Sequence, residues 1–434
     1  MILYNHLDVN EKGHLTIDGA DAVELAREYG TPAYILCENV IRENCRTYLN
    51  AAREYFGADA LPLYASKALS FTGVYKIAKE EGMGVDCVSG GEIYTALNAG
   101  FPAKKIYFHG NNKTDADLAY ALKNGVGTIV VDNKEELEAL SRIATERGVT
   151  QRILVRITPE IDPHTHRAVV TGNIDSKFGS PITTGAAMEM VRAALSAEGV
   201  SFEGIHCHIG SQIFDLEPFS DAADIMVRFI ADIKRECGIA VRELNLGGGF
   251  GVPYTEHDRR INYAEAIRDI AAIVTGYCEK HGITMPRVIL EPGRALVAAA
   301  GVTLYTVGSV KKIPEFRTYV SVDGGMPDNP RYALYGSKYT FLIANRADAP
   351  KCERVTVAGR CCESGDLLGE NVELQSAERG DILAVLTTGA YNYSMASNYN
   401  RLPRPPIVMV KDGKARLAVK RETYSDLCRN DVID

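Results

Sequence analysis

Eight short runs of strand-forming residues, separated by segments of helical periodicity, make up most of the first 300 residues of this 434-residue chain. Amphipathic segments lie between most of the runs, and many of them close on a glycine suited to a helix C-terminus. Eight strands alternating with helices over roughly 250 residues are typical of a (β/α)8 TIM barrel. The runs occupy residues 61–66, 84–89, 105–110, 128–133, 152–157, 203–210, 243–248 and 287–293.

Beyond about residue 300 the chain changes to β-branched runs without long helices, which predicts a second, antiparallel β domain. The first residues carry short apolar runs and a break at Thr31-Pro32, and we assign them to the same domain. The predicted fold class is therefore α/β. A TIM barrel is expected over residues 37–300, and an antiparallel β-sandwich or β-barrel over residues 1–36 and 301–434.

Composition excludes several classes of protein. Hydrophobic residues make up 46% and charged residues 24%, which is a balance that folds. The net charge of −8 offers no broad basic face, so nucleic acid is not an expected partner. No apolar run of about 18 residues occurs, and we expect a cytoplasmic protein without a membrane partner. The ten cysteines are scattered without a CxxC pair, so neither disulfides nor a structural metal is predicted.

Polar residues gather where the predicted strands end. Active sites of TIM barrels are built at that end, from the loops that follow the strands. We therefore treat these positions as candidate functional residues: Lys67, Asp86, Ser89, His109, Asn111, His208, Ser211, Gly247–Gly251, Glu291 and Arg294.

Lys67 directly follows the first strand. Partial desolvation there would disfavour the ammonium and leave an amine that attacks a carbonyl. The alternative is a lysine whose amine reaches solvent at the barrel rim. The run Gly247–Gly251 brings backbone N–H groups to a strand end, which suits an anionic phosphate, although a tight turn would need the same glycines.

Glu291 ends the eighth strand and needs a cationic or N–H partner to remain ionised. A pyridinium nitrogen or an internal pair with Arg294 would be such a partner.

His206 and His208 alternate along the sixth strand and point to one face. The pair could bind zinc, but further ligands at metal-like spacing are lacking. We favour an imidazole stacked on an aromatic cofactor, with a core role as the alternative for His206.

The β domain adds two groups of interest. Cys362 stands beside acidic residues in the segment 361–366, either as a functional thiol or as a buried thiol in a hairpin. Arg331 and Tyr335, four residues apart in a turn-rich segment, could clamp a carboxylate.

The candidate residues of both domains together call for one ligand with a phosphate, a ring nitrogen that binds a carboxylate, an aromatic ring on which a histidine stacks and an aldehyde that a lysine attacks. Pyridoxal 5'-phosphate has all four.

From about residue 30 to residue 401 the chain resembles the barrel-type (fold type III) pyridoxal-phosphate decarboxylases, most closely those that act on diaminopimelate. The resemblance implies loss of CO2 from meso-2,6-diaminopimelate to give L-lysine, the last step of lysine biosynthesis. It rests on eleven motifs in order: YASKA, GVDCVSGGE, HGNNK, THRAVVTG, SKFG, HCHIGSQ, NLGGGFG, EPGR, DGGMPDNPR, CESGD and GAYNYSMASNYN.

The resemblance also implies roles for single residues. Lys67 would bond to the cofactor aldehyde, His208 would stack on the ring and Glu291 would meet the ring nitrogen. Cys362 would supply or direct a proton, and Glu363 would bind the distal amine. The CESGD segment reaches the active site of the other subunit in the family, which implies a homodimer with shared sites. The remaining cofactor-binding residues are Asp86, Ser211, Gly248, Gly249, Phe250 and Tyr391, and the substrate-binding residues are Arg294, Arg331, Tyr335, Glu363 and Tyr391.

Other functions on the same scaffold stay open at this point. Decarboxylases of ornithine, arginine or carboxynorspermidine type are the nearest rivals. Their substrates present a distal cation and lack a distal carboxylate, so a site with Arg331 beside Glu363 fits a distal zwitterion better. A barrel-type racemase would not need the CESGD segment, and a catalytically silent homologue should lack Lys67 or Cys362. Two departures from the family, Tyr332 and Arg360, leave the matched residues in place.

Overall fold

The computed structural model describes residues 4–161 and 176–433, so the THRAVVTG motif at residues 165–172 lies outside the described residues. The chain forms two compact units. One comprises Met1–Glu43, Val252–Arg259 and Leu296–Asp434, and the other comprises Asn44–Gly251 and Arg260–Ala295. The sequence did not indicate that residues 252–259 join the first unit, and the domain limits of 37 and 300 stay a prediction.

The second unit contains the predicted barrel. Each of the eight predicted runs overlaps one strand, neighbouring strands pair in parallel, and the last strand pairs with the first. The strands are β5 (Leu61–Ala65), β6 (Gly84–Cys87), β7 (Ile106–Phe108), β8 (Thr128–Val131), β9 (Gln151–Thr158), β11 (Val200–His206), β12 (Glu243–Asn245) and β13 (Arg287–Leu290). The TIM-barrel prediction is confirmed.

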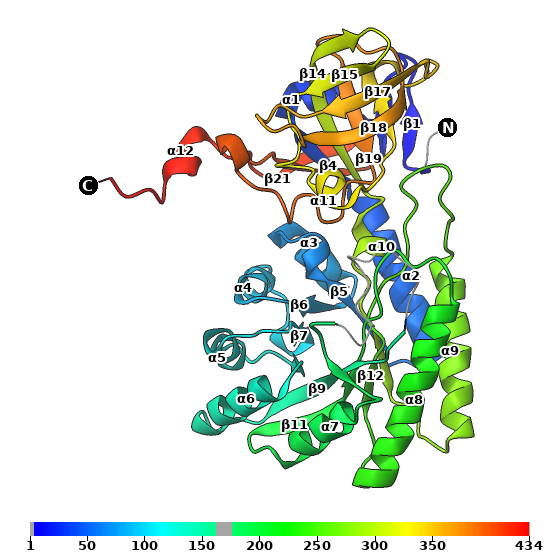
Figure 1. The fold of residues 1–434 in the computed structure, drawn as a ribbon, viewed down its shortest axis with the longest axis vertical. Helices are drawn as coiled ribbons and strands as arrows, with labels where there is room; N and C mark the ends of the chain where they lie inside the picture. Colours follow the sequence, from blue (N-terminus) through cyan, green and yellow to red (C-terminus); the bar gives the residue numbers. More distant parts are fainter. Residues whose placement is uncertain (1–3, 162–175, 434) are drawn as a thin grey trace. The chain divides into compact units, whose positions relative to one another are not determined.

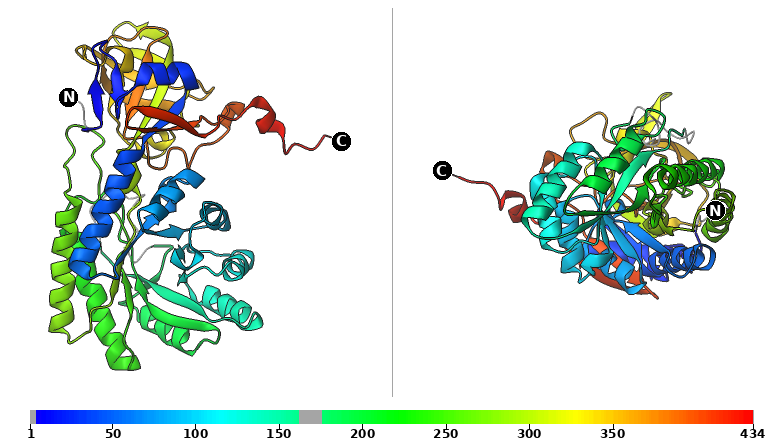
Figure 2. Two further views of the ribbon diagram at one scale, coloured as in Figure 1. Left: turned by 180° about the vertical axis from the view of Figure 1, so that it is seen from behind. Right: turned by 90° about the horizontal axis from the view of Figure 1, so that it is seen from below.

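The helices that connect these strands lie around the outside of the barrel (Figure 2). They are α3 (Thr72–Glu80), α4 (Gly90–Asn98), α5 (Asp115–Lys123), α6 (Lys134–Glu146), α7 (Ala186–Ser196), α8 (Glu217–Cys237) and α9 (Tyr263–Lys280), and the short strand β10 (Ser180–Pro181) pairs with β9. Several begin at a side chain that accepts a backbone N–H, such as Asn133 before α6. Buried apolar side chains form a cluster on the barrel strands: Leu61, Leu63, Tyr107, Val130, Leu154 and Ile289. The loops at the strand ends are therefore supported by a packed barrel interior.

The first unit is built on a sheet of nine strands (Figure 1). In order across the sheet, these are β18 (Leu367–Leu374), β17 (Glu353–Ala358), β15 (Arg317–Val322), β14 (Gly301–Ile313), β4 (Ala33–Cys37), β20 (Ile407–Lys411) and β21 (Lys414–Val419), while β19 (Ile382–Leu386) pairs with β14 and with β16 (Phe341–Ile343). Strand β4 lies between β14 and β20, so the N-terminal residues complete this sheet as predicted.

The pairing of this sheet corrects one part of the prediction. Most pairs are antiparallel, but β15 pairs with β17 and β4 with β20 in parallel, so the sheet is mixed. Parallel neighbours need a long connection, and here the whole barrel separates β4 from β20. The run of strands after residue 300 could not reveal this, because strand direction depends on which strands become neighbours.

Smaller elements complete both units. A three-stranded sheet of β1 (Leu7–Val9), β2 (Leu15–Ile17) and β3 (Ala20–Asp21) precedes α1, which spans Ala22–Tyr29. The other helices are α2 (Glu38–Phe56), α10 (Arg294–Val297), α11 (Arg331–Tyr335) and α12 (Tyr424–Cys428), with 3-10 turns η1 (Ser66–Ala68), η2 (Ala103–Lys105), η4 (Ala344–Arg346) and η5 (Tyr399–Arg401). Among the described residues, none of the helices is both long enough and apolar enough to cross a bilayer.

Candidate active site

Lys67 lies on the turn η1 directly after β5. The Oγ of Ser66 donates to Oε2 of Glu92 at 2.5 Å, and the N–H of Val88 donates to the same oxygen at 2.7 Å. Burial raises the pKa of Glu92, while Ser66, Val88 and Lys67 lower it. Glu92 thus ties the lysine turn to the loop after β6, a role that the sequence analysis missed although the motif GVDCVSGGE contains it.

The environment of Lys67 corrects the expectation of desolvation. The Lys67 side chain is exposed, although Ser66 and Ala68 on either side are buried. The reason is the 3-10 turn, which places the lysine outside the packing that its neighbours share.

Glu291 follows β13, with only 7% of the residue exposed. Its Oε1 accepts the side-chain N–H of Asn245 at 2.7 Å, and its Oε2 lies 3.2 Å from Nε2 of His206. Burial opposes ionisation, but the interactions with His206, His208 and Asn245 lower the pKa of Glu291 to about 2. The carboxylate is therefore ionised at neutral pH. Asn245 was not predicted, although the alternation of β12 places it on the opposite face from Leu244.

His206 also contacts a second histidine. Its Nε2 lies 3.1 Å from Nε2 of His109, and both rings are buried. Burial lowers the pKa of each ring, so both are neutral imidazoles at neutral pH. Together with Glu291 they present three possible metal-ligand atoms within 4.8 Å of one another. The absence of a metal stays a prediction.

His208 and the glycine run lie together beyond β11 and β12. The N–H of Gly248 points at Nδ1 of His208, 3.3 Å away. Burial, Lys67 and Arg156 hold the pKa of His208 well below its ordinary value, so the ring is neutral. A Cβ on Gly248 would lie 2.1 Å from the carbonyl oxygen of Glu291, and Gly249 has a φ of +124°. Only glycine fits at these two positions, so no side chain covers the backbone at this strand end.

Three further predicted residues of the barrel unit carry polar side chains: Asp86 in β6, Ser211 after β11 and Arg294 at the start of α10. Asp86 is 3% exposed, and its Oδ1 has no hydrogen-bond partner among the described residues. Burial and the nearby Glu291 raise the pKa of Asp86 well above its ordinary value, and Lys67 opposes this effect. The guanidinium of Arg294 donates to Oγ of Ser211 at 3.0 Å.

The first unit brings together three other predicted residues. The guanidinium carbon of Arg331 lies 4.8 Å from the ring centroid of Tyr335 and 4.8 Å from that of Tyr391. Arg331 is 6% exposed, and its Nε has no hydrogen-bond partner among the described residues. A buried cation between two aromatic faces with an unused N–H is suited to bind a carboxylate.

Cys362 lies in the turn that joins β17 to β18. Its N–H donates to Oδ1 of Asn400 at 2.8 Å, and the residue is exposed. The alternative of a buried thiol is therefore wrong for Cys362. The turn itself is held by Asp366, which is buried and accepts the N–H groups of Cys361 at 2.7 Å and Met326 at 2.6 Å. Burial and Asp366 raise the pKa of Cys361 to about 12, so that neighbouring thiol stays protonated.

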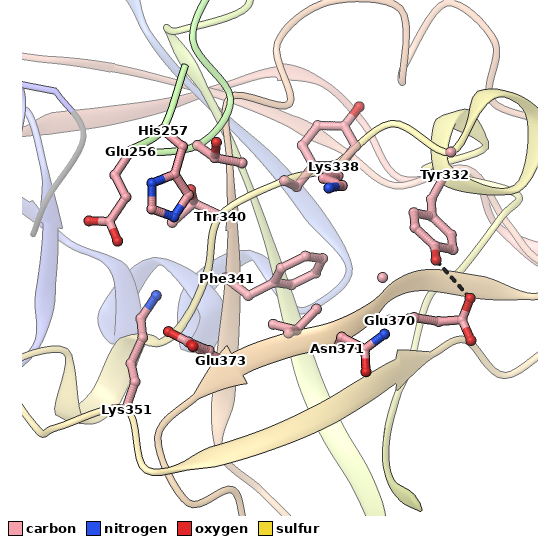
Figure 3. A pocket seen from close by; sticks show the side chains of 15 residues that line it. Glu256, His257, Tyr332, Lys338, Thr340, Phe341, Lys351, Glu370, Asn371 and Glu373 are labelled. Carbon is pink, nitrogen blue, oxygen red and sulfur yellow. Dashed lines mark hydrogen bonds between the residues drawn. The ribbon is translucent and has the colours of Figure 1, made fainter. Parts of the chain in front are cut away.

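A cavity of about 560 Å³ opens in the first unit and contains none of the predicted site residues (Figure 3). Its wall combines charged side chains such as Glu256 and Lys351 with the ring of Phe341. Tyr332 donates its O–H to Glu370 at 2.8 Å on one side. The predicted chemistry is therefore not located in this cavity.

The barrel unit fits pyridoxal phosphate on three observations. An ionised carboxylate is held at a strand end by Asn245 and His206, the glycine cradle would be filled by any Cβ, and a neutral His208 lies beside that cradle. Residues 40–298 match the family model described as the pyridoxal binding domain of pyridoxal-dependent decarboxylases. Fold and site thus define a pyridoxal-phosphate-dependent carboxy-lyase.

Relatives that match over nearly the full length of the chain show to which family within this class it belongs. The diaminopimelate decarboxylase of Bacillus methanolicus is 48% identical over 97% of this chain and 98% of its own length, and that of Bacillus subtilis is 45% identical over 100% and 98%. A crystal structure of diaminopimelate decarboxylase from M. jannaschii in complex with L-lysine superposes with a TM-score of 0.91 at 36% identity, over 100% of this chain and 99% of that one. The chain belongs to the diaminopimelate decarboxylase family.

Proposed function

We propose that this enzyme removes CO2 from meso-2,6-diaminopimelate to give L-lysine. The observation that carries the proposal is the ionised Glu291 at the end of β13, held by Asn245 and His206 in the same unit as Lys67 and the glycine cradle. A carboxylate in that state stabilises a protonated ring nitrogen, which decarboxylation on a pyridoxal ring requires.

Pyridoxal phosphate, when bound, supplies an electron sink for the bond that breaks at Cα. Lys67, whose side chain is exposed on a short turn, would hold it through its amine. Glu291 would keep a proton on the ring nitrogen, and His208 would stack on the ring. Ser211, Gly248, Gly249, Phe250 and Tyr391 would hold the phosphate, and Asp86 would be a further cofactor-binding residue.

Residues of the first unit recognise the substrate in this proposal. Arg331, with its unused Nε–H, binds a carboxylate between the rings of Tyr335 and Tyr391. Arg294 takes part in the same task from the barrel unit. Glu363 binds the distal ammonium, and Cys362, or Lys67 in its place, delivers the proton to Cα after CO2 leaves.

The substrate is tested by measuring CO2 release from diaminopimelate, ornithine and arginine side by side. We expect diaminopimelate to be turned over fastest, because Arg331 and Glu363 together match a distal zwitterion. Arg331→Gln should slow turnover of diaminopimelate far more than any residual turnover of ornithine, which has no distal carboxylate. Faster turnover of ornithine by the unmodified enzyme would overturn the assignment in favour of the rival decarboxylases.

We further propose that the enzyme is a homodimer whose subunits share active sites, with Cys362 and Glu363 serving the partner subunit. Mixing Lys67→Ala with Cys362→Ala chains tests this, because a mixed dimer would then contain one site with both residues intact. Recovery of up to about a quarter of the wild-type activity is the expected result on random assortment of chains. No recovery despite exchange of subunits would contradict shared sites. The cytoplasmic location stays a prediction.

A further inference from the structure

Asp328 lies three residues before Arg331 in the first unit, and its contacts hold the segment that leads to that arginine. Its carboxylate accepts the O–H of Tyr305 on β14 and the N–H of Gly325, the latter at 3.1 Å. Its main-chain carbonyl oxygen accepts the O–H of Tyr34 on β4 at 2.5 Å. Asp328 and both tyrosines are buried. Two neighbouring strands of the sheet therefore hold this residue in place.

The chain between Asp328 and Arg331 has little conformational freedom. Asn329 has no exposed surface, and its N–H donates to the carbonyl oxygen of Gly325 at 2.8 Å. Pro330 follows, with a φ that its ring fixes, and Arg331 is the first residue of α11. A displacement of Asp328 would therefore be passed on to the backbone of Arg331.

The guanidinium of Arg331 depends on that backbone for its position. Its charged group packs between the rings of Tyr335 and Tyr391, and Nη1 lies 3.9 Å from Sδ of Met395. Within the described part of the chain, Arg331 has no carboxylate partner, and its Nε has no acceptor. Rings and a thioether orient a guanidinium less strictly than a bidentate carboxylate does. The start of α11 therefore sets where this cation meets a substrate carboxylate.

We propose that Asp328 is a positioning residue that places the guanidinium of Arg331 for the distal carboxylate of the substrate. The inference deepens the proposed function and rests on the assignment of Arg331 as the residue that binds this carboxylate. Asp328 does not touch the substrate, and its effect passes through the backbone of residues 329–331. Loss of Asp328 should therefore reduce affinity only for ligands that carry the distal carboxylate.

Two ligands that differ by one carboxylate isolate this effect. L-Lysine retains the distal carboxylate of diaminopimelate, because CO2 leaves from the other end of the substrate. Cadaverine is lysine without its carboxyl group and keeps both amines. A general loss of stability or of cofactor would weaken binding of both ligands. The ratio of their dissociation constants therefore reports on carboxylate binding alone.

The test compares Asp328→Ala, Asp328→Asn and Asp323→Ala in the full-length enzyme loaded with pyridoxal phosphate. Alanine removes both acceptor oxygens at position 328, whereas asparagine keeps one. Asp323 is the matched control, because its carboxylate accepts the O–H of Thr31 at 2.6 Å and the N–H of Thr306 at 2.9 Å, away from the segment that leads to Arg331. Dissociation constants are measured from the change in cofactor absorbance, together with the melting temperature of each variant.

Asp328→Ala should weaken binding of L-lysine by about tenfold, as expected when a hydrogen-bonded charged contact is lost, and that of cadaverine by no more than about twofold. Asp328→Asn should lie between alanine and the wild type. Asp323→Ala should leave the ratio unchanged even if it lowers the melting temperature. The KM for diaminopimelate should rise with the dissociation constant of lysine while kcat changes less, because the distal carboxylate is bound equally before and during the reaction.

Tyr305→Phe tests the same contact from its other side. It removes one donor to Asp328, so it should change the ratio in the same direction, and less than additively when combined with Asp328→Ala. If Asp328→Ala does not fold, Tyr305→Phe and Asp328→Asn decide the question.

Three outcomes would overturn the inference: an unchanged ratio in the Asp328 variants, equal weakening of both ligands, or the same change of ratio in Asp323→Ala. Arg331→Gln separates these outcomes from failure of the proposed function. If Arg331→Gln leaves the ratio unchanged, Arg331 does not bind the carboxylate, and its assignment fails. If Arg331→Gln changes the ratio and the Asp328 variants do not, only the inference on Asp328 fails.

Discussion

Nζ of Lys113 lies 2.8 Å from Oε1 of Glu136 inside the barrel unit, with side chains that are 1% and 3% exposed. The same ammonium donates to the carbonyl oxygens of Gly110 at 2.8 Å and Val130 at 2.7 Å, so its three protons have three acceptors. Burial lowers the pKa of Lys113, and Glu136 opposes this effect. The pair ties the loop after β7, which carries His109, to the end of β8.

Replacing Lys113 by methionine should therefore destabilise the protein by roughly 3–5 kcal/mol, because Glu136 would remain buried without its counter-ion. Urea unfolding measures the change. The double variant Lys113→Met with Glu136→Gln should recover part of the loss. Lys134→Met breaks an exposed pair with Glu138 at 3.9 Å and should cost no more than about 1 kcal/mol. Equal losses of stability in the two single lysine variants would contradict the prediction that the buried pair contributes more than the exposed one.

The glycine cradle gives a second prediction. Gly249→Ala should abolish most pyridoxal phosphate binding, because a Cβ would lie 2.5 Å from the carbonyl oxygen of Gly210 and the φ of +124° disfavours alanine. Gly276→Ala in α9 is the matched control. No atom of the described residues lies near its added Cβ, and alanine there should stabilise the protein by about 0.5–1 kcal/mol. Equilibrium dialysis with the cofactor separates the two variants, and tight binding by Gly249→Ala would contradict a backbone cradle.

The turn that carries Cys362 depends on Asp366. Asp366→Ala would leave the N–H groups of Cys361 and Met326 without their acceptor, so we expect a loss of about 2–3 kcal/mol in stability. Amide hydrogen exchange at residues 361–363 should speed up in the same variant. Ser364→Ala, an exposed change in the same turn, should leave both measurements near the wild-type values. Unchanged exchange in Asp366→Ala would show that other contacts hold the turn.

Asp328 provides a prediction on pH. Burial raises its pKa from 3.8 to about 7, and the hydrogen bonds from Tyr305 and Gly325 only partly offset this. A raised pKa means that the folded state binds the proton more tightly than the unfolded state. The stability from this group is therefore complete below about pH 4 and is lost, by roughly 4 kcal/mol, as the pH rises to 7.

Asp328→Asn cannot ionise, so its free energy of unfolding should fall less between pH 4 and pH 7 than that of the wild type. Denaturant unfolding at several pH values gives the two slopes. Parallel slopes would show that Asp328 does not titrate in this range.

Lys67 provides the most direct test of the cofactor attachment. Borohydride treatment of the enzyme with pyridoxal phosphate should leave a stable adduct on the peptide that contains Lys67, detectable by mass spectrometry. Lys67→Ala should show no adduct there and should lose at least about 1,000-fold in the rate of CO2 release. An adduct on another lysine, with Lys67 unmodified, would contradict the assignment.

The sequence by itself determined the barrel, because strand and helix periodicities are properties of short segments. Each of the eight predicted runs forms a strand. The sequence also determined which residue types stand at the strand ends, and the resemblance to a known family attached roles to Lys67, Glu291 and Cys362. Only the tertiary structure decided that β4 joins a mixed sheet, since strand direction depends on neighbours distant in the chain. Likewise, the partners of Glu291 come from β11 and β12, and a single strand does not indicate which side chains will meet it. The exposure of Lys67 also depends on the tertiary structure, because its strand is buried but the turn after the strand leaves the side chain exposed.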